Sequence, residues 1–256
     1  MPRESYAQLS YGFQTQARGL LDADALRRRF GKLAKWYACR LGPHLPPDRD
    51  ATFLDVPCGY GNLLYFLQLK GYRNVAGYDL DPEQVRLARL LDLPAREGNA
   101  LALLSEGDQQ FDCIASIDFL EHISRDDALQ FLQSCWDRLR PGGTLILRTP
   151  CADGPFGAHD LFNDITHQWS LTAAALRTIL RMLDFERITI LDERPQPYNV
   201  VNMLRLMLFY PARLLASGMT RALGLDPPAI WSRAMWAIAH KPPTTDGVES
   251  RCPSSQ

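Results

Sequence analysis

The sequence FLDVPCGYGN, Phe53 to Asn62, decides the fold. Two apolar residues lead into Asp55, a turn carries Gly59 and Gly61, and the amphipathic run LLYFLQLKGY follows, an order that predicts a strand, a tight turn and a helix. Glycines allow a backbone to approach a ligand, and a helix start presents free N–H groups and a positive dipole end. The stretch is not the G-x-G-x-x-G fingerprint, because Pro57 occupies the first glycine position. It indicates a ligand-binding turn at the start of an α/β fold.

A second strand-like run, NVAGYDLD, carries an acidic residue at the spacing expected of a nucleoside site. Asp79 lies 18 residues after Gly61, near the roughly 20-residue spacing at which such folds hold ribose hydroxyls. The alternative is that Asp79 caps the helix DPEQVRLARLL. Asp81, followed by Pro82, is the better cap, which leaves Asp79 for a ligand.

From residue 51 onward, strand and helix patterns alternate, which predicts an α/β fold with a seven-stranded, mostly parallel sheet and right-handed crossovers. We expect strands near 52–56, 74–79, 95–98, 111–117, 143–149, 185–191 and 234–240, and alternating helices near 61–70, 82–92, 126–139 and 171–183. Ligands of such sheets lie at the carboxyl ends of the strands.

Composition agrees with one catalytic domain that carries additions. The chain has 256 residues, 46% of them hydrophobic, and a net charge of −1, so no global positive field recruits nucleic acid, and we expect no DNA partner; a local basic face stays open. Six cysteines without C-x-x-C spacing argue against a metal cluster or a disulfide framework, and the N-terminus lacks the pattern of a signal peptide. We expect a reduced, cytoplasmic protein.

The segments DVPCGYGN, GYDLD, EGNA, FDCIASIDFLEH and LRPGGTLIL resemble the successive motifs of class I S-adenosylmethionine-dependent methyltransferases, over about residues 50–194. The resemblance implies a Rossmann-like core, with helices on both faces of the sheet, that binds S-adenosyl-L-methionine. The turn residues would approach the methionine part, Asp79 the ribose, and Asn99 with Ala100 the adenine. The full set of implied cofactor-binding residues is Asp55, Pro57, Cys58, Gly59, Tyr60, Gly61, Asp79, Leu80, Asn99, Ala100 and Ile117.

The remaining segments divide around this core. Residues 1–49 read as helical, and in the resembled family such helices form a lid over the cofactor; a helix that only covers the sheet edge is the alternative. The core spans 50–194, a helical insert 195–232, a closing strand 233–241 and a disordered tail 242–256.

The stretch IDFLEHIS follows the fourth predicted strand, where the transferable methyl group is expected to emerge. His122 is a candidate general base for a hydroxyl acceptor, since imidazole titrates near neutral pH. His167, in the loop after the fifth strand, belongs to the same rim and is the second catalytic candidate. The alternative is that Glu121 and His122 only cap the next helix and support the loop.

Similar D/E-x-x-E-H and later His elements hold a divalent metal in small-RNA 2′-O-methyltransferases and ubiquinone-pathway O-methyltransferases. Asp118, Glu121, His122 and His167 would match those ligands, but Asp118 replaces the more usual glutamate and shortens the reach, so the sequence favours a metal-free site. The loop DITH resembles methyltransferases of bacterial surface-polysaccharide gene clusters, which act on sugars or sugar-linked groups.

The insert is rich in Leu, Met and aromatic residues, and it carries Arg205, Arg213 and Arg221 about two turns apart. These arginines and Pro211 exclude a bilayer span. A packed pocket wall is the favoured reading; a dimer contact and an interfacial helix are alternatives, so any membrane contact is at most peripheral.

The predicted function is therefore S-adenosylmethionine-dependent O-methylation of a small-molecule or glycan-linked hydroxyl. Alternatives are N-methylation, metal-assisted RNA 2′-O-methylation, and a non-catalytic cofactor-binding partner subunit. The sequence leaves the acceptor and the oligomeric state open.

Overall fold

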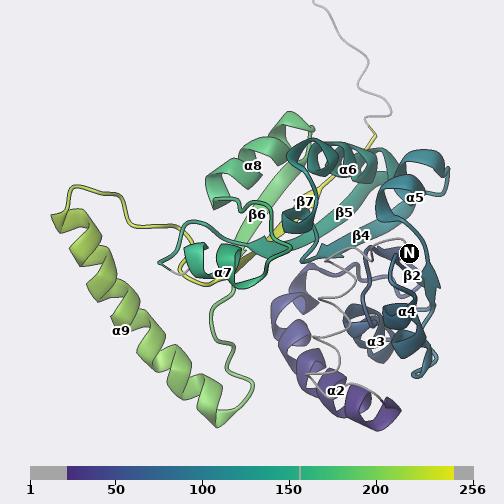
Figure 1. Ribbon diagram of the computed structural model, residues 1–256, viewed down its shortest axis with the longest axis horizontal. Helices are drawn as coiled ribbons and strands as arrows, with labels where there is room; N and C mark the ends of the chain where they lie inside the picture. Colours follow the sequence, from purple (N-terminus) through teal and green to yellow (C-terminus); the bar gives the residue numbers. More distant parts are fainter. Residues whose placement is uncertain (1–21, 156, 245–256) are drawn as a thin grey trace, which may run out of the picture.

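The computed structural model describes residues 22–155 and 157–244, and it contains a seven-stranded sheet in the order β3-β2-β1-β4-β5-β7-β6 (Figure 1). The first five strands run parallel, whereas β7 runs antiparallel to both β5 and β6. The strands are β1 Phe53–Asp55, β2 Val75–Asp79, β3 Ala95–Glu97, β4 Phe111–Ile117, β5 Leu139–Pro150, β6 Glu186–Asp192 and β7 Ala234–His240. All seven predicted strands and the Rossmann-like fold are confirmed.

Helices cover both faces of the sheet, as predicted. One face packs against α5, α6 and α8 through Leu104, Phe131 and Leu176, and the other packs against α2 and α3 through Tyr37 and Phe66. The helices are α2 Ala23–Arg40, α3 Asn62–Leu69, α4 Pro82–Arg89, α5 Ala100–Glu106, α6 Arg125–Arg138, α7 Gly157–Asn163, α8 Ala173–Met182 and α9 Val200–Ala222, with short 3-10 turns η1 Gly42–His44 and η2 Leu120–His122.

Helix caps follow the local chemistry of the sequence. Asp81 accepts a hydrogen bond from the Glu83 amide at 2.8 Å and caps α4, as predicted. Ser124 caps α6, so Glu121 and His122 do not carry out the capping role that was their alternative reading. Because Ser124 caps α6, the side chains of Glu121 and His122 are not used for capping, and both line a cavity at the rim of the sheet.

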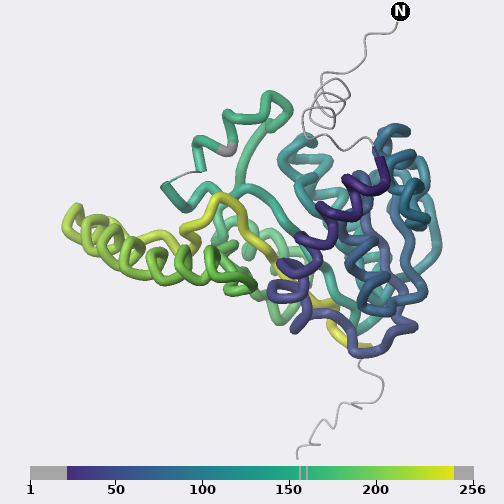
Figure 2. The backbone as a smooth tube through the Cα atoms, turned by 90° about the horizontal axis from the view of Figure 1, so that it is seen from below, coloured from purple at the N-terminus to yellow at the C-terminus, as the bar shows by residue number. Residues whose placement is uncertain are grey.

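The helical insert lies between β6 and β7, as predicted, but its packing differs from the expectation. Figures 1 and 2 show α9 projecting from the body of the molecule, attached by the chain segments at its two ends. Within α9 only Asn202 and Ser217 are buried. The favoured reading of a packed pocket wall is therefore wrong for most of this helix, because most of its apolar side chains are exposed; Phe209, which lines a cavity, is an exception.

Two predicted segments extend beyond the described part of the chain. The lid prediction covers residues 1–49, of which 1–21 lie outside it, and the tail prediction covers 242–256, of which 245–256 lie outside it. Across the described ranges, no helix combines the length and the apolar character that a membrane crossing needs.

Candidate functional site

A cavity of about 1020 Å³ lies at the carboxyl ends of β1, β2 and β4, where the sequence placed the ligand. It extends from Asp79 and Asn99 at one end to His122 and His167 at the other. Ten of the eleven residues expected to bind the cofactor line it, namely Asp55, Pro57, Cys58, Gly59, Tyr60, Asp79, Leu80, Asn99, Ala100 and Ile117. Gly61 is not among the lining residues.

The glycine turn is built for packing as well as for ligand approach. Gly61 has a φ of +88°, and a Cβ added there would lie 2.5 Å from Leu93 Cδ1. Gly61 therefore has a packing role, and its expected contact with the cofactor stays a prediction. Gly59, with a φ of +52°, is the glycine that faces the cavity, and its amide donates to Asp79 Oδ2 at 2.8 Å.

Two carboxyl groups give the cavity an acidic floor. Burial raises the pKa of Asp55 well above its usual value, and the neighbouring Asp79 raises it further. Burial also raises the pKa of Asp79, although the amides of Asp81 and Gly59 oppose that shift. A ligand that carries a positive charge would relieve both, because an opposite charge favours the ionised form.

At the end of the cavity beside α5, Asn99 has a structural role within the chain. Asn99 caps α5, and its Oδ1 accepts from the amides of Leu101 at 2.9 Å and Ala102 at 3.3 Å. That oxygen is therefore already engaged within the chain. Leu80 is 65% exposed and lies on the cavity wall with Leu101, so it is not an ordinary core leucine.

The opposite end of the cavity brings three predicted metal or base residues together. One potential ligand atom each from Glu121, His122 and His167 lies within 4.8 Å of the others, and the two imidazole centroids are 4.7 Å apart. Glu121 is buried; its Oε2 accepts from Thr149 Oγ1 at 3.0 Å, while Oε1 has no hydrogen-bond partner among the described residues. Burial, followed by the charge of Asp118, raises the pKa of Glu121 to about 8.

A short hydrogen-bond chain fixes the tautomer of His122. Thr166 Oγ1 lies 2.6 Å from Asp164 Oδ1 and 2.8 Å from His122 Nδ1. Partial burial would raise the pKa of Asp164, but hydrogen bonds from Thr166 dominate and lower it, so this carboxylate is ionised and only accepts. Thr166 must then donate to Asp164 and accept from His122, which puts the ring proton on Nδ1 and the lone pair on Nε2.

Burial lowers the pKa of His122 to about 4, and His167 contributes in the same direction. The ring is therefore neutral near pH 7. The loop that carries Asp164 and His167 is fixed against η2, because the Gln168 amide donates to the Glu121 carbonyl at 2.8 Å and the Gln168 side chain donates to the His122 carbonyl at 2.8 Å.

Asp118 does not join this group. Its carboxylate pairs with Arg148 at the end of β5, and Arg148 also donates to Glu193 at 2.8 and 2.9 Å. Burial alone would lower the pKa of Arg148, but the two carboxylates together raise it. The four-residue metal set is thus wrong for Asp118, because a cation on the neighbouring strand attracts it.

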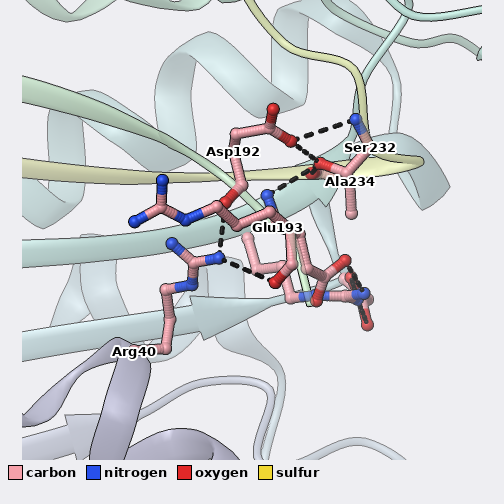
Figure 3. Close-up of polar contacts among 8 residues, drawn as sticks. Arg40, Asp192, Glu193, Ser232 and Ala234 are labelled. Atoms are coloured by element: carbon pink, nitrogen blue, oxygen red, sulfur yellow. Dashed lines mark hydrogen bonds and ion pairs between the residues drawn. The ribbon is translucent and has the colours of Figure 1, made fainter. Parts of the chain in front are cut away.

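Figure 3 shows how the carboxyl end of β6 is held beside this ion pair. The Glu193 amide donates to Ser232 Oγ at 2.7 Å, the Ser232 amide donates to Asp192 Oδ1 at 3.0 Å, and Arg40 of α2 donates to the Asp192 carbonyl. These contacts tie α2, the end of β6 and the segment before β7 together. Glu193 is thereby positioned facing Arg148.

A second cavity, also about 1020 Å³, adjoins the first and extends to α9. Both are lined by Tyr37, Asp118, Arg148 and Glu193, and the second adds Arg29, Lys32 and Phe209. Sequence reasoning missed Tyr37, Arg148, Glu193 and Arg233 as cavity residues. The only signal for Arg148 was a charged residue near the end of an otherwise apolar strand, LILRTP.

Comparison with known proteins identifies the family. Residues 25–190 match the family model described as a methyltransferase domain. The chain is also similar to tRNA U34 carboxymethyltransferases from Shewanella woodyi, at 31% identity over 170 residues, and from Alteromonas mediterranea, at 30% over 174. Each match covers 61% of this chain, and the chain spans about half the length of these curated relatives.

Solved structures agree on the fold. A SAM-dependent methyltransferase from Archaeoglobus fulgidus superposes with a TM-score of 0.63 at 18% identity, over 84% of this chain and 98% of the other. Phosphoethanolamine N-methyltransferase 2 of Haemonchus contortus, in complex with S-adenosyl-L-methionine, gives a TM-score of 0.55 at 16% identity, over 82% of this chain and 52% of that one.

Proposed function

The chain belongs to the class I S-adenosylmethionine-dependent methyltransferases, and from this premise we propose that it methylates a hydroxyl group of a small-molecule or glycan-linked acceptor. The single observation that supports this proposal is the hydrogen-bond chain from Asp164 through Thr166 to His122, at the end of the cavity opposite Asp79 and Asn99. A hydroxyl acceptor needs a base, and this chain orients one.

We assign the cofactor to the acidic end of the cavity. Gly59 and Asp55 would meet the methionine part, where the cationic ammonium offsets the buried carboxylates; Asp79 would accept from the ribose hydroxyls. The backbone at Asn99 and Ala100 would meet the adenine edge, because the Asn99 oxygen is engaged in capping α5. The sulfonium methyl group would then lie toward the two histidines.

In the proposed reaction, the acceptor oxygen attacks the methyl carbon in line as the carbon–sulfur bond breaks, and His122 Nε2 takes the hydroxyl proton. The products are a methyl ether, S-adenosylhomocysteine and an imidazolium. The low pKa keeps His122 in the neutral form that can accept a proton. Thr166, backed by the Asp164 carboxylate, accepts from Nδ1–H and stabilises the positive charge that develops on the ring.

The same residues also fit a divalent metal. One carboxylate oxygen of Glu121 lies within 4.8 Å of a ring nitrogen from each of His122 and His167, a mixed oxygen and nitrogen set that suits such ions. The buried Oε1 of Glu121 has no hydrogen-bond partner among the described residues. Bound there, a metal would act as a Lewis acid that lowers the pKa of the acceptor hydroxyl.

A radiolabelled methyl-transfer screen against sugars, glycans and quinone precursors tests the proposal. With an acceptor in hand, His122→Ala should lower kcat by roughly 10²–10⁴ while cofactor affinity stays near wild type, since a base acts only in the transition state. His44→Ala, at a histidine outside both cavities, is the matched control. Loss of wild-type activity on adding a chelator would indicate that the reaction is metal-assisted. Full turnover of both His122→Ala and His167→Ala would refute a chemical role for the pair.

An RNA acceptor is the second candidate. It is supported by the names of the tRNA-modifying relatives and by Arg29, Lys32 and Arg194 on the wall of the second cavity. The same screen therefore includes unmodified tRNA. Methylation of tRNA whose yield falls steeply with salt would favour this candidate over a glycan.

A further inference from the structure

The exposed side of α9 is far more apolar than that of an ordinary surface helix. The side directed at the body is mixed: it carries Asn202, Arg213 and Ser217 together with the half-buried Leu206 and Phe209, and Arg213 bonds to the Asp192 carboxylate and the Ala229 carbonyl at 3.4 Å. The side directed away from the body carries apolar residues at spacings of three and four. We call this side the outer face; its main residues are Leu204, Met207, Leu208, Leu214, Leu215 and Met219.

The outer face is long and open. Leu208, Leu214 and Leu215 are 72%, 73% and 70% exposed. A helix of 23 residues extends about 35 Å, so this is a continuous apolar ridge and not an isolated exposed leucine. Figures 1 and 2 agree that α9 stands apart from the sheet and its covering helices. Such a ridge requires an apolar environment that the described residues do not supply.

The charge around the ridge indicates which environment this is. From Arg194 to Leu225 the chain contains four arginines and no carboxylate. Arg205 and Arg221 lie on α9 beside the outer face, and long cationic side chains can extend from such a position to phosphate groups. Tyr198 and Tyr210, which suit an interface between water and lipid, lie before and within the helix. A second copy of the chain would bring the same positive charge and would be repelled.

We propose that the outer face of α9 docks on the surface of an anionic lipid bilayer. The apolar ridge enters the boundary between headgroups and acyl chains, and the flanking arginines contact anionic headgroups. The second cavity extends to Tyr198 and to Phe209 of α9. This proposal is independent of the chemistry assigned to the catalytic end, because it rests only on α9.

Sedimentation of the full chain with vesicles tests this surface. Vesicles of phosphatidylglycerol and phosphatidylcholine are compared with vesicles of phosphatidylcholine alone in physiological salt. The wild type should partition onto the anionic vesicles, and Leu208→Ser with Leu215→Ser should weaken that partitioning by at least about tenfold. Leu69→Ser with Leu129→Ser, at exposed leucines of α3 and α6, is the matched control and should bind like the wild type.

Two further measurements test the role of charge in lipid binding and distinguish lipid binding from self-association. Arg205→Gln with Arg221→Gln should reduce the preference for anionic over neutral vesicles, while circular dichroism and S-adenosylmethionine binding confirm that each variant is folded. Sedimentation equilibrium without vesicles checks for self-association. The proposal is overturned if the wild type binds neither kind of vesicle, or if it forms a dimer that the leucine variant abolishes and that does not bind lipid.

Discussion

Asp79 has two functions, one in holding the turn and one that we assign to the cofactor. In the protein alone its oxygens accept from the amides of Gly59 at 2.8 Å and Asp81 at 2.9 Å, and we assign the same carboxylate to the ribose hydroxyls. Asp79→Ala should weaken S-adenosylmethionine binding by about 1.5–3 kcal/mol, since an ionised acceptor is lost. Calorimetry measures this. A folded variant with unchanged affinity would remove the ribose assignment.

Asp55 predicts a pH dependence of stability. Its pKa in the folded protein lies well above 3.8, so its stabilising contribution is complete below about pH 4 and is lost as pH rises through the folded pKa. Asp55→Asn keeps the shape but cannot ionise. Without cofactor, this variant should therefore melt above the wild type near neutral pH, by a margin that shrinks toward about pH 4. Thermal unfolding across that range is the measurement, and a constant margin would contradict the assignment.

Residue-level roles were predicted where they follow from sequence position and missed where they depend on a distant partner. Asp79 and His122 follow strands, so topology alone places them on the cavity wall. Asp118 follows a strand in the same way, but its partner Arg148 lies thirty residues away on another strand. No local spacing reports that pairing, and the predicted metal set was wrong for Asp118 as a result.

At the scale of elements, the turn between β1 and α3 packs against Leu93, in the segment between α4 and β3. Gly61→Ala would force a Cβ toward Leu93 Cδ1 and also strain a backbone with a φ of +88°. Gly71→Ala is the matched control, since Gly71 has a φ of +83° and nothing within 4 Å of the added Cβ. Both variants should lose about 1 kcal/mol to backbone strain, and Gly61→Ala should lose a further 1–3 kcal/mol to overpacking. Equal losses in urea unfolding would argue against the packing role.

The four alternating helices and most of the strands carry clear apolar patterns and were predicted, as was β3, which has only three residues. Two short helices were not predicted. The helices α5 and α7, of seven residues each, are too short to display a helical period, and they were missed. The burial of α9 was wrong for another reason: an apolar pattern states which side of a helix avoids water, but not whether protein or lipid covers that side.

At the scale of the whole molecule, one continuous set of cavities joins the acidic cofactor end, the histidine pair and α9. Tyr37 of α2 lines both cavities, and α2 is held to the end of β6 by Arg40. We therefore propose that α2 belongs to the lid predicted for residues 1–49. The assignment of His122 to the reaction depends on how the cofactor is oriented in this space.

The most direct test of the cofactor orientation is an isotope-filtered nuclear Overhauser measurement. It uses the protein bound to S-adenosylmethionine that is labelled with ¹³C at the transferable methyl group. In the assigned orientation, the methyl protons should contact ring protons of His122 or His167, and adenine protons should contact the side chain of Ala100. Methyl contacts to Ala100 with adenine contacts to the histidines would show the reverse orientation. That result, or a methyl group with no contact to either histidine, would contradict the assigned orientation and the catalytic role of His122.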